Sequence, residues 1–469
     1  MSVRVSVGVS ASARAGAPLA RRVPARCMAA TSPPGAAPWQ AFKLPSSLPE
    51  AFSLLTSAES REALAAIAAD PEKRNYWAYQ LGRTAFFTVS GVASATLAAN
   101  GQSGAVDFSR ASADGLGGLL GSLLELYRVD LDNIERGVYR RPYDSDVKHR
   151  QFDPLFVLDR QRRLYAAYQG TRDRRERKAG TEMRETVAEA IGEGTYPEYY
   201  LQNFHYQEDG WLSPTSAKAY EHGTEALFQG SQDVMQRQAL VPVSEWMKEG
   251  ARGKAEGDVR LLEVAGGTGR FHTFIKDNWP RMQTTFNDLS PAYVAEAREN
   301  LDYYSKFRAA RGDTVELART EIVQANAEAL PFEDASFDCL VNVYLFHELP
   351  RDVRRGIARE MARVLAPGGL VVINDSLQQG DRADMDAVLP LFPANYHEPY
   401  YMDYTQDDLT AIMREAGLEP YRAPTVAHVS KVWSFIKPEA DGIPPVAATS
   451  AVVAEPAVVA VVEAAAADE

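Results

Sequence analysis

The sequence is poor in cysteine, in positive net charge and in long apolar runs. Its 469 residues include only Cys27 and Cys339, which in practice excludes a disulfide framework and a cysteine-based structural zinc site. No metal site is predicted. The formal net charge of −13 disfavours a nucleic-acid binder driven by positive charge, so no nucleic-acid partner is expected. The chain is therefore expected to be mostly globular, with two or three domains.

Both ends of the chain are short of residues that build a core. No acidic residue precedes Glu50, whereas Ala, Ser, Val, Pro and Arg are frequent there. This composition is typical of an organelle transit peptide, and residues 23–30 resemble plastid cleavage contexts. We therefore predict a plastid transit peptide at 1–40 and a chloroplast location; a disordered tail without an address is the alternative. The Ala/Val-rich tail 439–469 lacks large side chains and is predicted to be disordered.

Residues 45–235 are predicted to form a mostly helical N-terminal region, with helices at 48–69, 84–99 and 116–127. The segment 84–99 carries no charge and is shorter than the roughly 20 apolar residues of a membrane span. We expect a buried helix there, with peripheral contact to a plastid membrane as the alternative. Residues 160–178 hold eight basic and two acidic side chains. They predict a solvated helix face, with anionic lipid as the alternative partner.

An aromatic-rich stretch closes this region. It contains Tyr196, Tyr199, Tyr200, Phe204, His205, Tyr206 and Trp211. Aromatic side chains offer a large contact area together with a polar group. The stretch therefore has two interpretations, a cap over a substrate pocket or a packing surface against the next domain, and the sequence leaves both open.

Residues 240–437 alternate apolar runs with helical patterns, which is typical of a parallel sheet covered on both faces. The expected strands are 260–265, 282–287, 320–324, 337–343, 369–375 and a last strand at 426–436. The expected helices are 270–278, 291–304, 351–365 and 406–416. The fold class predicted for this domain is α/β.

The first of these strands runs directly into a glycine-rich turn, VAGGTG at 264–269. Glycines at such a turn can take positive φ and leave no Cβ in the way of a ligand. Glu263 ends the strand and is expected to brace the turn or the amino-acid portion of a cofactor. Asp288 lies 19 residues beyond Gly269, at the end of the second strand, where an acidic residue accepts hydrogen bonds from ribose hydroxyls.

Two later segments complete a series of motifs. Residues 323–332 (VQANAEALPF) follow the third strand, where a polar side chain and a backbone N–H can recognise an adenine edge. Residues 363–369 (RVLAPGG) end a helix and turn sharply into the fifth strand. The order and spacing of these motifs resemble class I S-adenosylmethionine-dependent methyltransferases of type 11. VAGGTG and 323–332 are especially similar to the ubiquinone/menaquinone C-methyltransferase branch.

The resemblance implies a Rossmann-like seven-stranded domain at 240–437 that uses S-adenosyl-L-methionine as its cofactor. The residues implied to bind that cofactor are Ala265, Gly266, Gly267 and Gly269 at the methionine end, Asp288 at the ribose, and Asn326 and Ala327 beside the adenine. Nicotinamide-dependent dehydrogenases share the glycine turn and the acidic residue. The Leu-Pro-Phe and Pro-Gly-Gly motifs argue against that alternative.

The acceptor side departs from the quinone branch. Where those enzymes carry an Arg-Asn pair after the fourth strand, this chain has YLFHELP at 344–350. His347 is the candidate general base, because its ordinary pKa lies near neutrality; a hydrogen-bonded loop residue is the alternative. Glu348 orients it or acts itself, and Asp375 is a further candidate. Within 392–401, the candidate substrate contacts are His397, Tyr400 and Tyr401, unless this is a packed surface loop.

These observations favour a plastid methyltransferase that acts on a small molecule, aromatic or prenylated and quinone-like. Two alternatives stay open. One is a catalytically weak or inactive methyltransferase-fold protein that acts in plastid assembly or regulation, since a fold does not dictate a function. The other is a protein methyltransferase that acts on a basic target, which no motif in the sequence supports.

Overall fold

The computed structural model describes residues 26–27, 58–98, 113–191 and 194–439. Most of the predicted transit peptide at 1–40 and nearly all of the tail 439–469 lie outside the described residues, as do residues 48–57 of the first predicted helix.

One mixed sheet forms the centre of the molecule. Its strands are β1 (Arg26–Cys27), β2 (Arg260–Val264), β3 (Gln283–Asp288), β4 (Thr320–Gln324), β5 (Phe337–Val343), β6 (Leu365–Ser376), β7 (Glu419–Ala427) and β8 (Ser430–Ile436). They follow the order β1-β7-β8-β6-β5-β2-β3-β4. Only β8 runs antiparallel to its neighbours, β6 and β7, among the described strands. The strands from β2 to β8 form the predicted seven-stranded sheet, and β1 adds two residues at its edge.

The prediction of a single last strand at 426–436 is wrong. The structure has a hairpin there, in which β7 ends at Ala427 and β8 begins at Ser430. His428 makes the turn with a positive φ of 59°. No glycine or proline marks this turn, so the apolar pattern runs through it without a visible break in the sequence.

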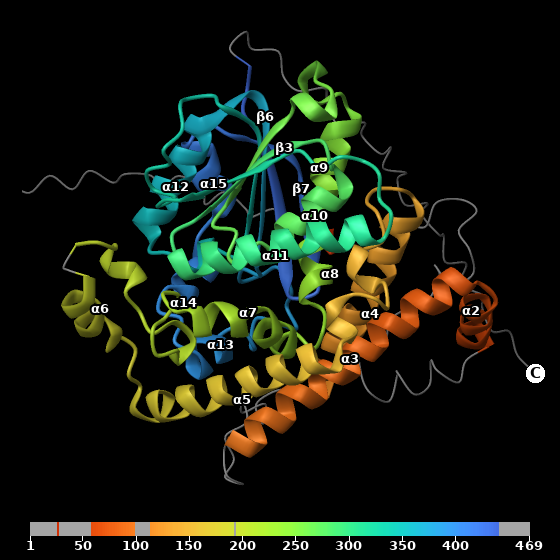
Figure 1. Ribbon diagram of the computed structural model, residues 1–469, viewed down its shortest axis with the longest axis horizontal. Coiled ribbons are helices and arrows are strands. Elements are labelled where there is room, and N and C mark those ends of the chain that lie inside the picture. The colour runs from red at the N-terminus through yellow and green to blue at the C-terminus, as the bar shows by residue number, and fades with distance from the viewer. Residues whose placement is uncertain (1–25, 28–57, 99–112, 192–193, 440–469) are drawn as a thin grey trace, which may run out of the picture.

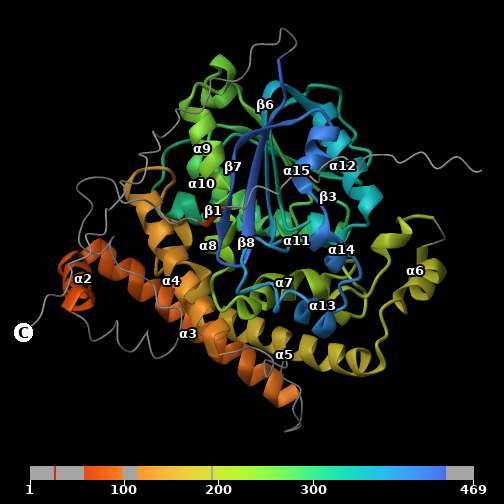
Figure 2. The ribbon, with the colours of Figure 1, turned by 180° about the vertical axis from the view of Figure 1, so that it is seen from behind.

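Helices cover both faces of the sheet because successive strand side chains point to opposite faces. Leu262 packs against α12 and α15, whereas its neighbour Leu261 packs against α9, α10 and α11. Figures 1 and 2 show the two helix layers on opposite sides of the strands. The helices of this part are α8 (Gln232–Arg237), α9 (Leu240–Lys248), α10 (Arg270–Asn278), α11 (Pro291–Ala310), α12 (Arg351–Val364), α13 (Leu391–Asn395), α14 (Tyr401–Gln406) and α15 (Leu409–Glu415).

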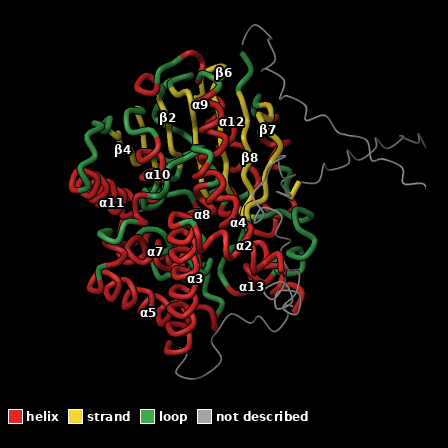
Figure 3. The backbone as a smooth tube through the Cα atoms, turned by 90° about the vertical axis from the view of Figure 1, so that its right-hand side faces the viewer, coloured by secondary structure: helices red, strands yellow, loops and turns green. Residues whose placement is uncertain are grey.

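The N-terminal helices form a separate base at one end of the sheet. They are α2 (Ala58–Ala69), α3 (Pro71–Ala98), α4 (Ala113–Glu135), α5 (Pro154–Arg177), α6 (Met183–Ile191) and α7 (Pro214–Leu227). Figure 3 shows α3, α5 and α7 stacked beneath the strands. Each of α5 and α7 starts with a proline that directly follows a capping side chain, Asp153 and Ser213 respectively, which is a strong helix-start signal.

Short 3₁₀ helices connect the elements: η2 (Tyr143–Ser145), η3 (Arg150–Phe152), η4 (Glu198–Tyr200), η5 (Phe204–Tyr206), η6 (Ala251–Gly253), η7 (Glu256–Asp258) and η8 (Phe346–Glu348).

A half-buried arginine joins this base to the sheet domain. Arg270 opens α10, directly after the glycine turn, and donates to both carboxylate oxygens of Asp233 at 3.0 and 2.6 Å. It also donates to Asp144 at 2.5 Å. Two-point pairing between an arginine and a carboxylate fixes geometry as well as supplying energy. Asp233 also pairs with Arg83 of α3 at 3.3 Å, and this second pair connects the base to the start of α10.

The prediction that 84–99 is a buried helix is wrong as to burial. Residues 84–98 belong to α3, but only one side of that helix packs against α5 and α7. Its other side is apolar and exposed: Val89 is 66% and Val92 is 63% exposed, and Leu81, Phe86 and Leu97 lie on the same helix with 41–64% exposure. Absence of charge does not by itself require burial. Within the described residues, no helix is long and apolar enough to cross a membrane.

Candidate functional site

The glycine turn after β2 is strained and tightly enclosed. Gly267 and Gly269 take the positive φ expected of them, 61° and 74°, and Ala265 takes a φ of 52°. Gly266 is required for a different reason, since a Cβ there would overlap the Phe286 ring. The turn thus carries backbone strain at Ala265, which is uncommon for a residue with a side chain and is often found at functional sites.

Asp288 holds this turn from the end of β3. Its Oδ2 accepts from the backbone N–H of Gly267 at 2.9 Å, and its Oδ1 accepts from that of Ser290 at 2.8 Å. Burial raises the pKa of Asp288 to about 6. A carboxylate has about four acceptor positions, so Asp288 retains lone pairs for a ligand.

Glu263 pairs with a histidine of α10, the helix that follows the turn. Its Oε2 lies 2.8 Å from Nδ1 of His272, and Nε2 of His272 lies 2.9 Å from the hydroxyl of Thr284. Burial raises the pKa of Glu263 well above its ordinary value and lowers the pKa of His272 to about 3. Both shifts favour a neutral pair, in which the Glu263 carboxyl donates to the ring.

The segment after β4 is held by a local turn. Asn326 Oδ1 accepts from the backbone N–H of Glu328 at 3.0 Å. Tyr199, from the aromatic stretch, donates to Glu328 Oε2 at 2.7 Å. Asn326 and Ala327 thereby lie at the same edge of the sheet as Asp288.

One cavity brings these residues together at the carboxyl ends of the parallel strands. Of the eight predicted cofactor residues, all but Gly269 line it: Glu263, Ala265, Gly266, Gly267, Asp288, Asn326 and Ala327. Gly269 lies instead against α11, where a Cβ would meet that of Ala297 at 3.1 Å. Its role is close helix packing.

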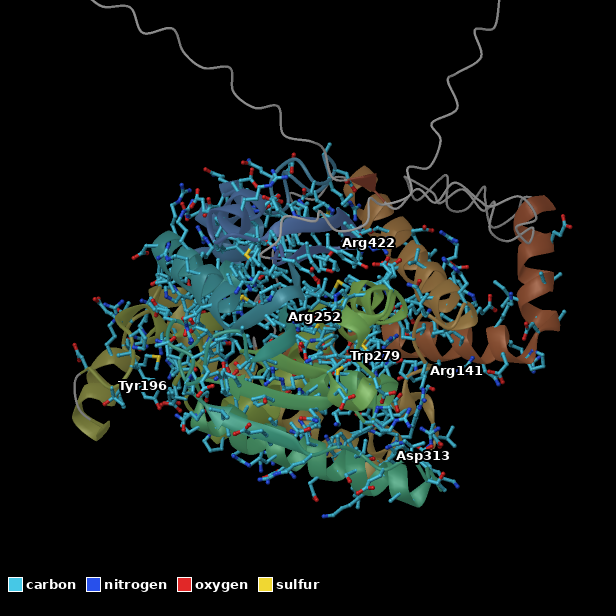
Figure 4. All side chains as sticks on the ribbon, turned by 90° about the horizontal axis from the view of Figure 1, so that it is seen from above. Arg141, Tyr196, Arg252, Trp279, Asp313 and Arg422 are labelled. Carbon is cyan, nitrogen blue, oxygen red and sulfur yellow. The ribbon has the colours of Figure 1, made fainter. Side chains whose placement is uncertain are left out.

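The aromatic stretch supplies the opposite wall. Tyr199, Tyr200, Phe204 and Trp211 line the same cavity. Tyr220 of α7 joins them, and its ring contacts that of Trp211 at 5.9 Å between centroids. Tyr196 is not part of this wall, and Figure 4 shows it at the outer margin of the molecule. Tyr199 and Trp211 also pack against core residues of the sheet domain, so the cap over a substrate pocket stays a prediction.

Two buried amide oxygens in the cavity wall have no hydrogen-bond partner. They are Oε1 of Gln236 and Oδ1 of Asn287. Leaving a buried acceptor unpaired costs roughly 1–3 kcal/mol. Gln236 lies in α8, outside the recognised motifs, and nothing in the sequence pattern pointed to it.

A second, larger cavity adjoins the first. It has a volume of about 440 Å³, lies between α3, α5 and α7, and shares Tyr220, Gln236 and Arg270 with the cofactor-side cavity. Apolar rings of Phe86, Phe87, Phe152 and Phe156 line part of it.

The three predicted catalytic residues lie in different surroundings: His347 and Glu348 follow β5, and Asp375 belongs to β6. Asp375 is fully buried and accepts from the Phe346 backbone N–H at 2.7 Å, while its Oδ1 lies 2.5 Å from His347 Nδ1. Burial alone would lower the pKa of His347, but the adjacent Asp375 carboxylate raises it to about 10. His347 is thus a cation at neutral pH. Of the three, only Glu348 lines the cavity.

Glu348 belongs to a cluster with His205 and Glu398. His205 Nε2 contacts Glu398 Oε1 and lies 3.9 Å from Glu348 Oε1. Burial raises the pKa of Glu348 to about 8 and that of Glu398 to about 7. His347 Nε2 adjoins the cluster, 3.6 Å from Glu348 Oε1.

None of the predicted substrate residues lines the cofactor-side cavity. His397 hydrogen-bonds Gln202 at 3.0 Å. Tyr401 is buried, and its hydroxyl lies 2.8 Å from that of Ser376. The side chain from this loop that does approach the cavity is Glu398, next to Glu348; the substrate role of His397, Tyr400 and Tyr401 stays a prediction.

The sheet has a single antiparallel strand beside β6, and the glycine turn faces an acidic residue at the end of β3. A comparison with known sequences agrees with this arrangement. Residues 262–373 match the family model of a methyltransferase domain. Residues 262–373 thus form a domain of the methyltransferase family.

Relatives of this methyltransferase domain include a malonyl-[acyl-carrier protein] O-methyltransferase from Geobacter sulfurreducens, 30% identical over 168 residues, which cover 35% of this chain and 57% of that protein. A ubiquinone/menaquinone biosynthesis C-methyltransferase from Enterobacter is 32% identical over 180 residues, with 34% and 66% covered. The chain thus spans less than two thirds of either relative. A structure described as a SAM-dependent methyltransferase from Aquifex aeolicus covers 48% of this chain and 99% of its own, at 19% identity and a TM-score of 0.32.

Proposed function

We propose that this protein transfers a methyl group from S-adenosyl-L-methionine to a small acceptor, aromatic or prenylated and quinone-like. The observation that carries the proposal is the shared cavity, in which the glycine turn and Asp288 face the aromatic wall of Tyr200, Trp211 and Tyr220. One wall offers polar groups for a nucleoside, and the other offers apolar rings. Ligand sites commonly combine a mostly apolar lining with a few placed polar groups.

The residues present match the cofactor. Asp288 has free lone pairs for the ribose hydroxyls, and the unpaired oxygens of Gln236 and Asn287 suit the ammonium of the methionine portion. Gly266 and Gly267 leave the backbone accessible, and Asn326 and Ala327 flank the place of the adenine. When bound, S-adenosylmethionine supplies a sulfonium methyl group that is already activated by its positive charge.

The cap and the adjoining cavity support an apolar acceptor. The rings of Phe204, Trp211 and Tyr220 offer a stacking surface beside the cofactor wall. The cavity of about 440 Å³ beyond Tyr220 has room and apolar rings for a prenyl tail. Malonyl-carrier and quinone methyltransferases both occur among the relatives. We therefore infer the class of acceptor from the residues that line the two cavities.

We assign proton removal from the acceptor to Glu348. It is the only one of the three predicted catalytic side chains on the cavity, whereas Asp375 and His347 stand behind it. Asp375 fixes the ring of His347, and His347 places a positive charge 3.6 Å from Glu348. His347 and Asp375 are therefore positioning residues in this proposal.

We also propose that the protein acts in the plastid, at a membrane surface. The composition of residues 1–40 supports the location. The exposed apolar side of α3, with Val89 and Val92, supports peripheral contact, since exposed apolar patches commonly mark interaction surfaces.

An acceptor panel tests the function. The full chain is incubated with S-adenosylmethionine and a prenylated benzoquinol, the same quinol without its tail, or a basic peptide, and S-adenosylhomocysteine is measured. We expect turnover with the prenylated quinol, weaker turnover without the tail and none with the peptide. Turnover with the peptide alone would instead identify a protein methyltransferase. Binding without turnover on any acceptor would favour the inactive, regulatory alternative.

A further inference from the structure

Three metal-ligating side chains from distant parts of the chain meet beside the cofactor-side cavity. His205 lies in η5 of the cap, Glu348 in η8 after β5, and Glu398 in the loop before α14. One ligand atom from each lies within 4.8 Å of the other two. The cluster exists only where the cap packs against the methyltransferase domain.

We propose that His205, Glu348 and Glu398 bind a divalent transition-metal ion. The carboxylate of Glu398 is completely buried, and its Oε2 has no hydrogen-bond partner. Oε2 of Glu348 is also buried and unpaired. The His347 cation faces Oε1 of Glu348 at 3.6 Å, which leaves both Oε2 atoms without a donor. A cation bound by both carboxylates supplies a partner for these two oxygens.

The distance between His205 and Glu348 is compatible with one shared ion. Metal–ligand bonds of about 2.0–2.2 Å to nitrogen and oxygen allow two ligand atoms to stand up to about 4 Å apart. His205 Nε2 and Glu348 Oε1 are 3.9 Å apart. The direct contact between His205 and Glu398 is replaced when the ion binds between them.

The donor set selects the class of metal. One imidazole and two carboxylates suit Mn²⁺, Fe²⁺, Co²⁺ or Zn²⁺, whereas Ca²⁺ prefers oxygen ligands throughout and Mg²⁺ usually keeps several waters. Apolar rings surround the imidazole: those of Trp211 and Tyr396 lie 5.1 and 6.0 Å from that of His205. Such a shell limits water access and strengthens electrostatic interactions.

An ion held by these three residues would lie beside the cavity that Glu348 lines. A metal there can polarise an acceptor oxygen. A carboxylate bound to a metal is a weak base, so an ion here would replace the proton removal proposed for Glu348 by polarising the acceptor. Metal binding itself does not require methyl transfer, so its test uses metal binding alone.

The experiment titrates Co²⁺ into the full chain after chelator treatment and removal of the chelator, and follows visible absorption and calorimetry. We expect one Co²⁺ per chain, with a visible band that Zn²⁺ displaces. Glu398→Gln and His205→Asn should each weaken binding at least tenfold. Glu296→Gln is the matched control, because Glu296 is also buried with an unpaired Oε2 but pairs with Arg160; it should bind like the wild type.

Circular dichroism checks that each variant folds. If Glu398→Gln does not fold, His205→Asn and the wild-type titration together test the metal site. Absence of saturable Co²⁺ or Zn²⁺ binding by the wild type would overturn the proposal. So would equal affinities in the wild type and the folded cluster variants, or binding of Mg²⁺ alone.

Discussion

The backbone N–H of Gly267 donates to Oδ2 of Asp288 at 2.9 Å, and this bond joins the first and second strands of the methyltransferase domain at their carboxyl ends. It makes Asp288 both a clamp on the glycine turn and the acceptor offered to the ribose. Loosening the bond should therefore affect the turn and the cofactor together.

Asp288→Asn should weaken S-adenosylmethionine binding about 10- to 100-fold. The substitution replaces a charged acceptor by a neutral one, and a hydrogen bond to a charged group contributes about 1.5–3 kcal/mol. Calorimetric titration gives the dissociation constants. Asp302→Asn is the control, because Asp302 is an exposed carboxylate on α11 that pairs only with Lys306 among the described residues; its affinity should not change. Equal affinities in all three proteins would contradict the role of Asp288.

Cofactor affinity should also depend on pH through Asp288. Burial raises the pKa of this carboxyl to about 6, so the ionised acceptor dominates above pH 7 and is lost as the pH falls through 6. Affinity should be constant from pH 7 to 8 and should fall by up to about tenfold per pH unit below 6. In Asp288→Asn the same titration should be flat across this window. A wild-type profile equally flat to pH 5 would refute the assignment.

Gly266→Ala should destabilise the fold by about 1–3 kcal/mol and abolish cofactor binding, because the new Cβ would overlap the Phe286 ring. Urea unfolding measures the free energy. Gly82→Ala is the matched control: Gly82 lies within α3, where an added methyl group would meet no atom within 4 Å, and alanine there should leave stability unchanged or raise it by about 0.5–1 kcal/mol. If both variants had the same stability, the close approach at Gly266 would be unimportant.

Glu348→Gln should lower turnover by about 10²- to 10⁴-fold, the usual contribution of a general base. Cofactor affinity should change little, because Glu348 belongs to the acceptor end of the cavity. Single-turnover rates and calorimetry separate the two effects. His347→Asn, which removes a positioning charge, should give a smaller loss. A Glu348→Gln enzyme with full activity would exclude Glu348 as the base.

Val89→Asp combined with Val92→Asp should reduce co-sedimentation with lipid vesicles, since both exposed side chains lie on the apolar side of α3. Charged side chains resist burial at the acyl boundary. The control is Val315→Asp, which alters an exposed valine between α11 and β4. Equal sedimentation of the wild type and the double variant would exclude this side of α3 as the contact.

The sequence predicted that the glycine turn, Asp288 and the segment after β4 lie together, and the reason is local. Asp288 ends β3 and Asn326 lies two residues after β4, so parallel pairing brings both to the edge of the sheet that holds the glycine turn. The cluster of His205, Glu348 and Glu398 has no such signal, because a cap residue meets two loops only through tertiary packing. The β7–β8 hairpin was missed since its turn contains His428 rather than glycine.

The decisive measurement for methyl transfer to a small apolar acceptor uses S-adenosylmethionine with an isotopically labelled methyl group and a plastid lipid extract. We expect label in a hydrophobic, extractable product, made by the wild type and lost in Glu348→Gln. A wild-type protein that binds the cofactor yet leaves the extract unlabelled would contradict the proposed function.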